Sequence, residues 1–333
     1  MSEQQNSGRP GAAVAVLVDH LDGAVRPTAL ELLTLARGLD RQVHAVWVGS
    51  EGGAEAPAAE LAAHGAHVVH EVEVAGADAR LTASVVDALQ AVLTAVGDVG
   101  LLLVPSTFEG REVAARLAVR TGAGVVTGAS GVAVEDGRWT ARKTVLAGGW
   151  DTACALTGPL AVVALASHAV QAVAQEAAAP SLVRHTAQAS AAARAVTVVS
   201  RTRRPTSERP PLAEAEVVVV GGRGVEGDFS GVEELADVLG GAVGATRVAT
   251  DEGWIGHEAQ VGQTGVTISP RLYIGVGVSG AVHHKGGMAA SATVVAVNND
   301  PDAPVFEFAD YGIVGDLTEV LPALTAELRR RRG

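Results

Sequence analysis

Two apolar runs that end directly in glycine-rich turns constrain the fold of this 333-residue chain most strongly. Val217 to Val220 is an unbroken valine run followed by Gly221-Gly-Arg-Gly224, and Leu272 to Val276 runs into Gly277-Val-Ser-Gly280. Short apolar runs bounded by glycine are typical of the buried strands of a parallel sheet. Glycines, a serine and helix-forming residues after such a strand place backbone amides where an anionic or electron-rich ligand can bind. The pattern therefore predicts a ligand site at the carboxyl ends of these strands.

The first part of the chain alternates strand-like and helix-like segments. Pro27 suits the first turn of a helix, Gly38 suits its end, and Ser106-Thr107 supplies an N-cap. Strands are expected at 13–19, 43–48, 68–72 and 101–105, and helices at 27–38, 58–63, 81–96 and 110–120. Strands separated by helices of this length indicate βαβ units and a mostly parallel sheet.

The sequence pattern changes after Thr121, where short β-like runs are separated by glycines. Asp136-Gly137 between two of these runs is a hairpin signal. The runs are Val125, 132–135, 139–146, 151–156 and 160–166. This part is predicted to be antiparallel and added to the βα portion, with a further strand at 195–200.

A segment rich in arginine and proline divides the chain. Arg201 to Pro211 holds four arginines and three prolines and cannot continue a helix or a central strand, so it is predicted to be a linker. Beyond it, strands are expected at 217–220, 244–248, 272–276 and 293–297, and helices at 232–239, from Ser279, and at 316–329. The predicted fold class is α/β with two domains. Residues 1–203 form an N-terminal βα sheet domain with added antiparallel strands, a scaffold and partner-docking domain, and residues 204–333 form a C-terminal Rossmann-like parallel-sheet domain.

Composition excludes several classes of function. The net charge of −12 and the 3% aromatic content argue against a nucleic-acid or anionic-membrane surface. Cys154 is the single cysteine, and the polar segment Met1 to Gly11 resembles no targeting signal, so a cytoplasmic protein without direct membrane insertion is expected. Adjacent side chains such as His283-His284 point in different directions, and no metal site is expected. No catalytic set of side chains groups in one region, which leaves the chemistry to a cofactor.

Two matches to the G-x-G-x-x-G pattern follow strands, Gly222 to Gly227 and Gly275 to Gly280. Both cannot mark the pyrophosphate turn of one dinucleotide fold, and an NAD site also needs an acidic residue about twenty positions on, where Thr246-Arg247 stand. A nicotinamide-dependent oxidoreductase stays open as an alternative, as does an adenine-nucleotide-binding regulatory module. We favour one cofactor site that uses both turns, with the planar guanidinium of Arg223 against a pyrophosphate.

Four sequence patterns carry a family resemblance. They are Gln260-Val-Gly-Gln-Thr-Gly265, Leu272-Tyr-Ile-Gly-Val-Gly-Val-Ser-Gly-Ala281, Val297-Asn-Asn-Asp-Pro-Asp-Ala-Pro304 and Ala309-Asp-Tyr-Gly-Ile-Val-Gly-Asp-Leu317. Together they resemble the FAD-binding domain of the electron-transfer flavoprotein alpha subunit, over roughly Val217 to Leu324. The resemblance implies a bacterial FAD-dependent one-electron carrier without a substrate of its own. It would form a heterodimer with a beta subunit and transiently meet acyl-CoA and related flavin dehydrogenases of fatty-acid β-oxidation and a membrane quinone oxidoreductase.

The resemblance also implies which residues bind the cofactor. By it, Arg247 lies against the isoalloxazine, Thr264 bonds the N5 edge and His284 reaches the O2 region. Asn298 and Asp316 are assigned to the ribityl-to-adenosine portion, although a turn-capping amide and the first residue of a helix explain them equally well. The predicted FAD-binding residues are Arg223, Thr246, Arg247, Gln260, Val261, Gly262, Gln263, Thr264, Ser279, Gly280, Ala281, Val282, His283, His284, Asn298 and Asp316.

This chain departs from the family pattern at three of these positions or beside them. Thr246 stands where Ser is usual and keeps the hydroxyl, His283 replaces a usual Gln, and Lys285-Gly286 replaces an apolar-small pair. The last two changes alter the charge around the pocket, and the sequence does not fix the direction of their effect on the flavin.

Overall fold

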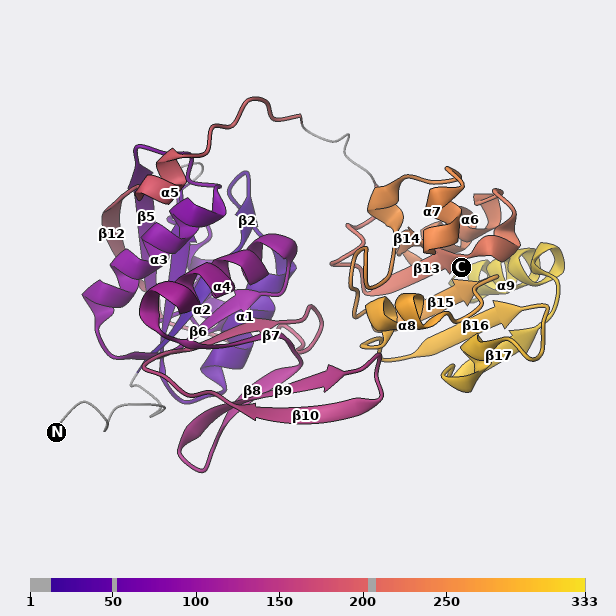
Figure 1. Ribbon diagram of the computed structural model, residues 1–333, viewed down its shortest axis with the longest axis horizontal. Coiled ribbons are helices and arrows are strands. Elements are labelled where there is room, and N and C mark those ends of the chain that lie inside the picture. The colour runs from indigo at the N-terminus through magenta and orange to yellow at the C-terminus, as the bar shows by residue number, and fades with distance from the viewer. Residues whose placement is uncertain (1–12, 50–52, 203–207, 333) are drawn as a thin grey trace. The chain divides into compact units, whose positions relative to one another are not determined.

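The computed structural model describes residues 13–49, 53–202 and 208–332. The chain divides into two compact units, one made of the described residues up to 143 together with 152–202, the other of 144–151 together with 208–332. Figure 1 shows the elements of each unit. The predicted domain boundary between residues 203 and 204 lies outside the described residues, as does the segment Met1 to Gly11.

A seven-stranded sheet with the strand order β12-β5-β4-β1-β6-β11-β7 forms the centre of the first unit. Its neighbouring strands run parallel, as the βαβ pattern predicts. Its strands are β1 (Ala13–Val18), β4 (Gln42–Val48), β5 (Val68–Ala75), β6 (Val99–Pro105), β7 (Gly124–Ala129), β11 (Ala161–Leu165) and β12 (Ser181–Gln188). All residues of β1 are buried, because helices cover both faces of the sheet.

Helices α1 (Pro27–Arg37) and α2 (Ala58–His64) pack on one face of this sheet, and α3 (Thr82–Val96) and α4 (Phe108–Thr121) pack on the other. The signals in the sequence act where they were expected. Pro27 stands in the first turn of α1, and the Oγ1 of Thr107 accepts the amide hydrogen of Gly110, 3.0 Å away, at the start of α4. Gly122 ends α4 with a φ of 67°, a conformation that glycine adopts without strain.

The prediction of an antiparallel addition after Thr121 is right for only part of the segment. Strands β8 (Gly131–Glu135), β9 (Arg138–Val145) and β10 (Trp150–Ala155) form a separate three-stranded sheet, and β8 pairs antiparallel with β9 across Asp136-Gly137. Strands β7 and β11 instead join the parallel sheet, with β11 between β6 and β7. Short runs rich in Ala and Val carry no signal that distinguishes the two kinds of pairing, so the sequence could not separate them.

The strand predicted at 195–200 is wrong. The structure has a short helix α5 (Ala191–Arg194) before this segment and no regular element within 195–200, where Val199 is 93% exposed. The edge strand β12 lies earlier and pairs with β5 along all eight of its residues. β-Branched residues favour a strand only where a pleated surface buries them. Here β5 pairs with the more polar segment that forms β12.

In the second unit the sheet has five parallel strands in the order β14-β13-β15-β16-β17. The strands are β13 (Val217–Gly221), β14 (Ala242–Ala245), β15 (Leu272–Val276), β16 (Val294–Asn298) and β17 (Tyr311–Val314). The helices and 3₁₀ turns are η1 (Arg223–Val225), α6 (Ser230–Leu239), α7 (Arg247–Asp251), η2 (His257–Ala259), α8 (Val282–Met288), η3 (Pro304–Glu307) and α9 (Leu317–Arg332). This arrangement confirms the predicted α/β fold class. The strand order reverses between β13 and β15, the usual position of a ligand in such sheets.

Three details of the second unit correct the sequence-based expectations. The strand expected at 244–248 ends at Ala245, and Arg247 begins helix α7 instead. The strand β17, whose four residues are all exposed, was not predicted, because a run of four residues interrupted by Gly312 gives little strand pattern. The helix expected from Ser279 begins at Val282.

Three histidines lie in a row across neighbouring strands of the first sheet. Nδ1 of His44 on β4 lies 2.8 Å from Nε2 of His70 on β5, and Nδ1 of His70 lies 2.8 Å from Nε2 of His185 on β12. The ring centroids of successive members are 5.1 Å apart. We call these three residues the histidine row; His44 and His70 are buried.

Candidate functional site

The carboxyl ends of the five parallel strands in the second unit bring seven of the sixteen predicted FAD-binding residues to one edge of the sheet. At these ends stand Arg223 after β13, Thr246 and Arg247 after β14, Ser279 and Gly280 after β15, Asn298 at the end of β16, and Asp316 after β17. Strands β13 and β15, which flank the order reversal, carry the two glycine-rich turns. Segments that lie far apart in the sequence therefore share the edge at which open α/β sheets bind ligands.

The two glycine-rich turns pack directly against each other. A Cβ atom at Gly222 would lie 2.3 Å from the carbonyl oxygen of Gly277, and one at Gly224 would lie 2.8 Å from the Cα of Gly277. The amide of Gly224 donates to the carbonyl of Gly277 over 3.0 Å. Only glycine permits this approach, so the two G-x-G-x-x-G matches form one backbone cradle.

A buried hydroxyl without a partner lies beside this cradle. The amide of Thr246 donates to the carbonyl of Gly221 over 3.0 Å, which fixes the backbone after β14 next to the end of β13. The Oγ1 atom of Thr246 is buried and has no hydrogen-bond partner among the residues that the structure describes. A buried hydroxyl left in this state costs about 1–3 kcal/mol, and a polar group of a ligand would remove that cost.

The two predicted arginines are both exposed at this edge. Nε of Arg247 donates to Asp251 one helical turn later, over 3.1 Å, in a pair whose side chains are 67% and 52% exposed. An exposed ion pair of this kind contributes little stability, so the guanidinium can turn towards an anion without a large loss.

The segment Gln260 to Thr264 lies against the end of β14. The amide of Val261 donates to the carbonyl of Ala245 over 2.9 Å. The buried amide of Gln260 accepts from Thr250 and donates to Oγ1 of Thr264, both over 3.0 Å. Because Oγ1 of Thr264 already accepts this bond, its own hydrogen points away from Gln260, at an exposed position.

The loop also packs tightly on helix α8. Gly262 has a φ of 157°, and a Cβ atom at Gly287 would lie 2.4 Å from the Cα of Gly262. The amide of Gln263 donates to the carbonyl of His283 over 2.9 Å. Backbone contact and hydrogen bonding therefore hold the loop and the helix in one relative position.

The two adjacent histidines of α8 differ sharply in environment. Nδ1 of His283 lies 3.1 Å from Oε1 of Gln263 at the surface. His284 is 6% exposed, and its ring nitrogens meet the carbonyl of Val261 at 2.9 Å and the hydroxyl of Tyr273 at 2.7 Å. Burial lowers the pKa of His284 to about 4, against the opposing effect of the hydrogen bond to Val261. Since both nitrogens have partners within the chain, a direct hydrogen bond from His284 to a ligand requires that one of these bonds be given up.

The residues between β15 and α8 expose backbone to the edge. Gly280 has a φ of 89°, and a Cβ atom there would lie 2.4 Å from the amide nitrogen of Val305. The carbonyl of Ser279 accepts the hydrogen of the same amide over 3.1 Å. The side chains of Ser279, Ala281 and Val282 are exposed.

Asn298 and Asp316 have local partners. Nδ2 of Asn298 donates to the carbonyl of Val278 over 3.0 Å, and its Oδ1 accepts from the amide of Asp300. Oδ1 of Asp316 accepts from the hydroxyl and the amide of Thr318, and these hydrogen bonds lower the pKa of Asp316. The structure thus shows the turn and helix-start roles that the sequence left open, and their contact with the cofactor stays a prediction.

Three residues of the site were missed by sequence reasoning. Thr250 holds Gln260, Asp251 holds Arg247, and Tyr273 holds His284. The spacing of Asp251, four positions after Arg247, would have indicated the ion pair had helix α7 been predicted in place of a strand. Tyr273 gave a weaker signal as the one residue of its apolar run with a hydroxyl.

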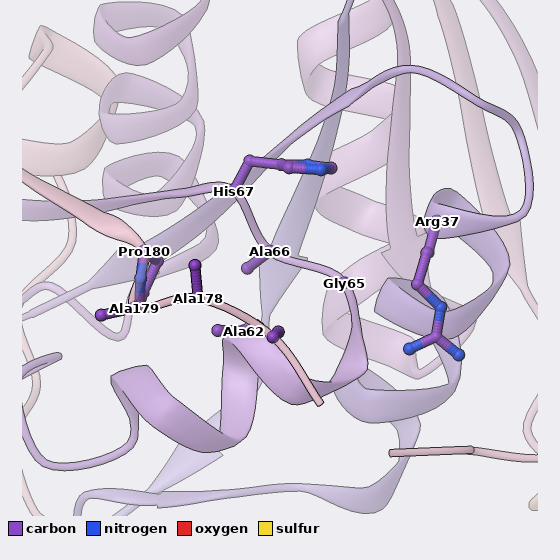
Figure 2. Close-up of a pocket in the computed structure, with 9 residues that line it drawn as sticks. Arg37, Ala62, Gly65, Ala66, His67, Ala178, Ala179 and Pro180 are labelled. Carbon is purple, nitrogen blue, oxygen red and sulfur yellow. The ribbon is translucent and has the colours of Figure 1, made fainter. Parts of the chain in front are cut away.

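The first unit contains a cavity of about 260 Å³, shown in Figure 2. Mainly small residues around the end of α2 and the approach to β12 line it, together with Arg37 and His67. The guanidinium of Arg37 donates to the carbonyls of Ala63 and Val173, and Nδ1 of His67 accepts from the amide of Val43. These polar groups already serve the fold, and the cavity contains none of the predicted site residues.

A metal site and a membrane-spanning helix are both absent from the described residues. Over 13–49, 53–202 and 208–332, no group of three or more His, Cys, Asp and Glu side chains is placed to hold a metal ion. In the same part of the chain, no helix combines the length and the apolar character that crossing a bilayer requires.

Comparison with known proteins identifies the family. Residues 14–200 match the electron transfer flavoprotein domain, and residues 211–289 match the electron transfer flavoprotein FAD-binding domain. The chain is 40% identical to an electron transfer flavoprotein subunit alpha of Mycobacterium leprae over 97% of this chain and all of that protein. It is 38% identical to the corresponding subunit of Syntrophomonas wolfei over 96% of this chain and 100% of the relative, and 32% identical to that of Bacillus subtilis over 96% and 98%.

The site geometry fits the cofactor of that family. The two glycine-rich turns meet at the carboxyl edge, the buried hydroxyl of Thr246 has no partner among the described residues, and two exposed arginines suit a molecule that carries phosphates. The chain belongs to the electron transfer flavoprotein alpha subunit family, and its cofactor is FAD.

Proposed function

We propose that this protein is a one-electron carrier that holds FAD at the carboxyl edge of the second sheet and has no substrate of its own. The observation that carries the proposal is that all five strand ends of this sheet bring predicted FAD-binding residues to one edge, beside a glycine cradle and a buried hydroxyl without a partner. FAD supplies the redox chemistry by accepting and passing on single electrons. The chain binds it, orients it and tunes its charge.

Fourteen of the sixteen predicted residues divide this work by their chemistry. We assign Arg223 to the pyrophosphate, because a guanidinium matches phosphate oxygens in a planar fork. Arg247 supplies a fixed positive charge near the flavin ring, and Thr264 offers its exposed hydroxyl hydrogen to the N5 edge. Thr246 offers its buried hydroxyl, while the loop from Gln260 and the segment from Ser279 to Val282 supply the backbone around the ring. Asn298 and Asp316 are assigned to the ribityl-to-adenosine portion.

The partners follow from the family. The alpha-subunit names of the relatives support a beta subunit as the obligate partner, which we propose to dock on the first unit and complete the pocket. Acyl-CoA and related flavin dehydrogenases would deliver electrons, and a membrane quinone oxidoreductase would receive them. The chain is expected in the cytoplasm, without direct membrane insertion and without nucleic-acid binding.

The test of this proposal is the visible spectrum of the full chain purified with its beta subunit. Flavin absorption with about one FAD per heterodimer, bleached by an acyl-CoA dehydrogenase and its substrate, is expected. A colourless complex that binds NAD would instead support a nicotinamide-dependent oxidoreductase. A colourless complex that binds only AMP or ATP would support an adenine-nucleotide-binding regulatory module.

Replacing Arg247 by Gln is expected to lower the reduction potential of the bound flavin. A fixed cation favours flavin that carries extra negative charge, and its loss near a partly exposed site is worth on the order of 1–2 kcal/mol per electron. Arg247→Lys keeps the charge without the planar fork and should retain most of the potential. Spectroelectrochemical titration of the three proteins measures the effect, and equal potentials for Arg247→Gln and wild type would reject this role.

A further inference from the structure

A buried polar contact joins Tyr273 to His284 in the second unit, and the family resemblance gives Tyr273 no role. Tyr273 stands within β15 with 0% exposure, and His284 on α8 is 6% exposed. The hydroxyl oxygen lies 2.7 Å from Nε2 of His284, a short distance for a neutral pair. The ring centroids are 5.9 Å apart and the ring planes are tilted by 52°, so the two rings are not stacked.

The carbonyl of Val261 decides which nitrogen of His284 carries the proton. Nδ1 lies 2.9 Å from this oxygen, and a carbonyl can only accept, so Nδ1 is the donor. In a neutral imidazole the other nitrogen is then an acceptor, and the hydroxyl of Tyr273 donates to Nε2. The direction of every hydrogen along Tyr273, His284 and Val261 is therefore fixed.

We propose that Tyr273 is a positioning residue that locks His284 in the neutral tautomer protonated at Nδ1 and, through it, holds the carbonyl of Val261 and the loop that follows. This role rests on the proposed function, because the loop from Gln260 to Thr264 is the one assigned to the flavin. His284, with its uncharged ring, then serves the cofactor by holding that loop in place. The positive charge near the flavin comes from Arg247.

Among the residues that the structure describes, no hydrogen bond or ion pair joins His284 to a charged side chain that could compete with this lock. On α8 the neighbouring titratable side chains are His283, which lies against Gln263 at the surface, and Lys285, whose Nζ lies 4.7 Å above the ring of Phe308. Residues 260–266 carry no titratable side chain, and on β15 Tyr273 is the titratable residue. Burial raises the pKa of Tyr273, which keeps its hydroxyl protonated as a donor.

The test compares Tyr273→Phe with Tyr311→Phe in the full chain, with and without FAD and the beta subunit. Tyr311 is the other tyrosine of the chain and is 68% exposed, so it is a matched control. Nitrogen-15 NMR of the histidine rings reports which nitrogen of His284 is protonated. In wild type Nδ1 should carry the hydrogen, and Nε2 should show the shift of a hydrogen-bonded acceptor.

Tyr273→Phe should leave Nε2 of His284 without its hydrogen-bond donor. A donor to the neutral ring opposes protonation, so its removal is expected to raise the protonation constant of His284 about tenfold and to weaken FAD binding by a similar factor. Tyr311→Phe should change neither. In a double-mutant cycle with His284→Gln, the effects on the FAD dissociation constant should be non-additive, because both changes break the same link.

Two results would overturn the proposal. One is a wild-type spectrum with the hydrogen on Nε2 of His284, which needs no variant to fold. The other is an unchanged protonation constant in Tyr273→Phe. If wild-type protein bound no FAD, the proposed function would fail, while the spectra of the full chain would still decide the role of Tyr273.

Discussion

Replacing Gly287 by alanine is expected to weaken FAD binding roughly 100-fold, whereas the same change at its neighbour Gly286 leaves binding intact. A Cβ atom at Gly287 would lie 2.4 Å from both the Cα and the amide nitrogen of Gly262. Both are backbone atoms, which cannot swing aside as a side-chain end can. The loop from Gln260 to Thr264 must therefore move away from α8. Overpacking of this kind costs about 3 kcal/mol or more, and a displaced loop should raise the FAD dissociation constant roughly 100-fold.

Gly286 is the matched control, because it lies in the same helix and faces open space. Its Cβ would meet only the Cβ of Gln263, at 3.9 Å, and alanine there should stabilise the helix by ~0.5–1 kcal/mol. Flavin content after purification with the beta subunit, and fluorescence titration with FAD, measure both variants. Equal flavin content in the two variants would show that the contact between α8 and the loop does not position the cofactor site.

The first unit is expected to lose stability as the pH falls from about 6.5 to 4. Burial, followed by the neighbouring rings of His44 and His185, lowers the pKa of His70 to about 4, and burial followed by His67 lowers the pKa of His44. The unfolded chain takes up these protons near pH 6.5, and the folded chain resists them. The stability is therefore fully present above pH 6.5 and is lost towards pH 4, by about 3 kcal/mol from His70 alone.

Urea unfolding at several pH values, followed by hydrogen exchange of the amides in β4 and β5, measures this loss in the first unit. His70→Gln removes the titrating ring from the middle of the histidine row and should flatten the pH dependence, at a cost in stability at neutral pH. His257→Gln, at an exposed position of the second unit, should leave the slope as it is. If the free energy of unfolding of His70→Gln fell with pH as steeply as that of the wild type, the acid sensitivity would come from other residues.

The sequence predicted the elements that depend on local patterns. The valine run before Gly221 and the run from Leu272 to Val276 form strands β13 and β15, as their glycine-rich ends indicated. Pro27 and Thr107 act at the starts of α1 and α4, and Gly38 acts at the end of α1, through contacts within a few residues, so sequence spacing was enough.

The errors arose where distant parts of the chain decide the structure. Strands β7 and β11 join the parallel sheet next to β6. A local sequence pattern does not show which strand a segment will pair with. The segment at 195–200 has the β-branched residues of a strand, but no neighbouring strand pairs with it in the described structure. Arg247 begins a helix because the chain turns at Thr246, whose amide bonds to Gly221 some distance upstream.

The same limit applies to the site. Sequence motifs placed the predicted residues at strand ends, and the sheet order explains why those ends meet. The hydrogen bonds of His284 to Tyr273 and Val261 could not be predicted, because they depend on the packing of a strand, a loop and a helix against one another.

The shared edge of the second sheet also determines when during biosynthesis the pigment can be acquired. Its contributing segments, from the turn after β13 to the start of α9, leave the ribosome one after another, and the outermost strand emerges last. A partly translated chain therefore presents only fragments of the receptor surface. Loading of flavin at the proposed site should therefore wait until nearly the whole second unit has been synthesised.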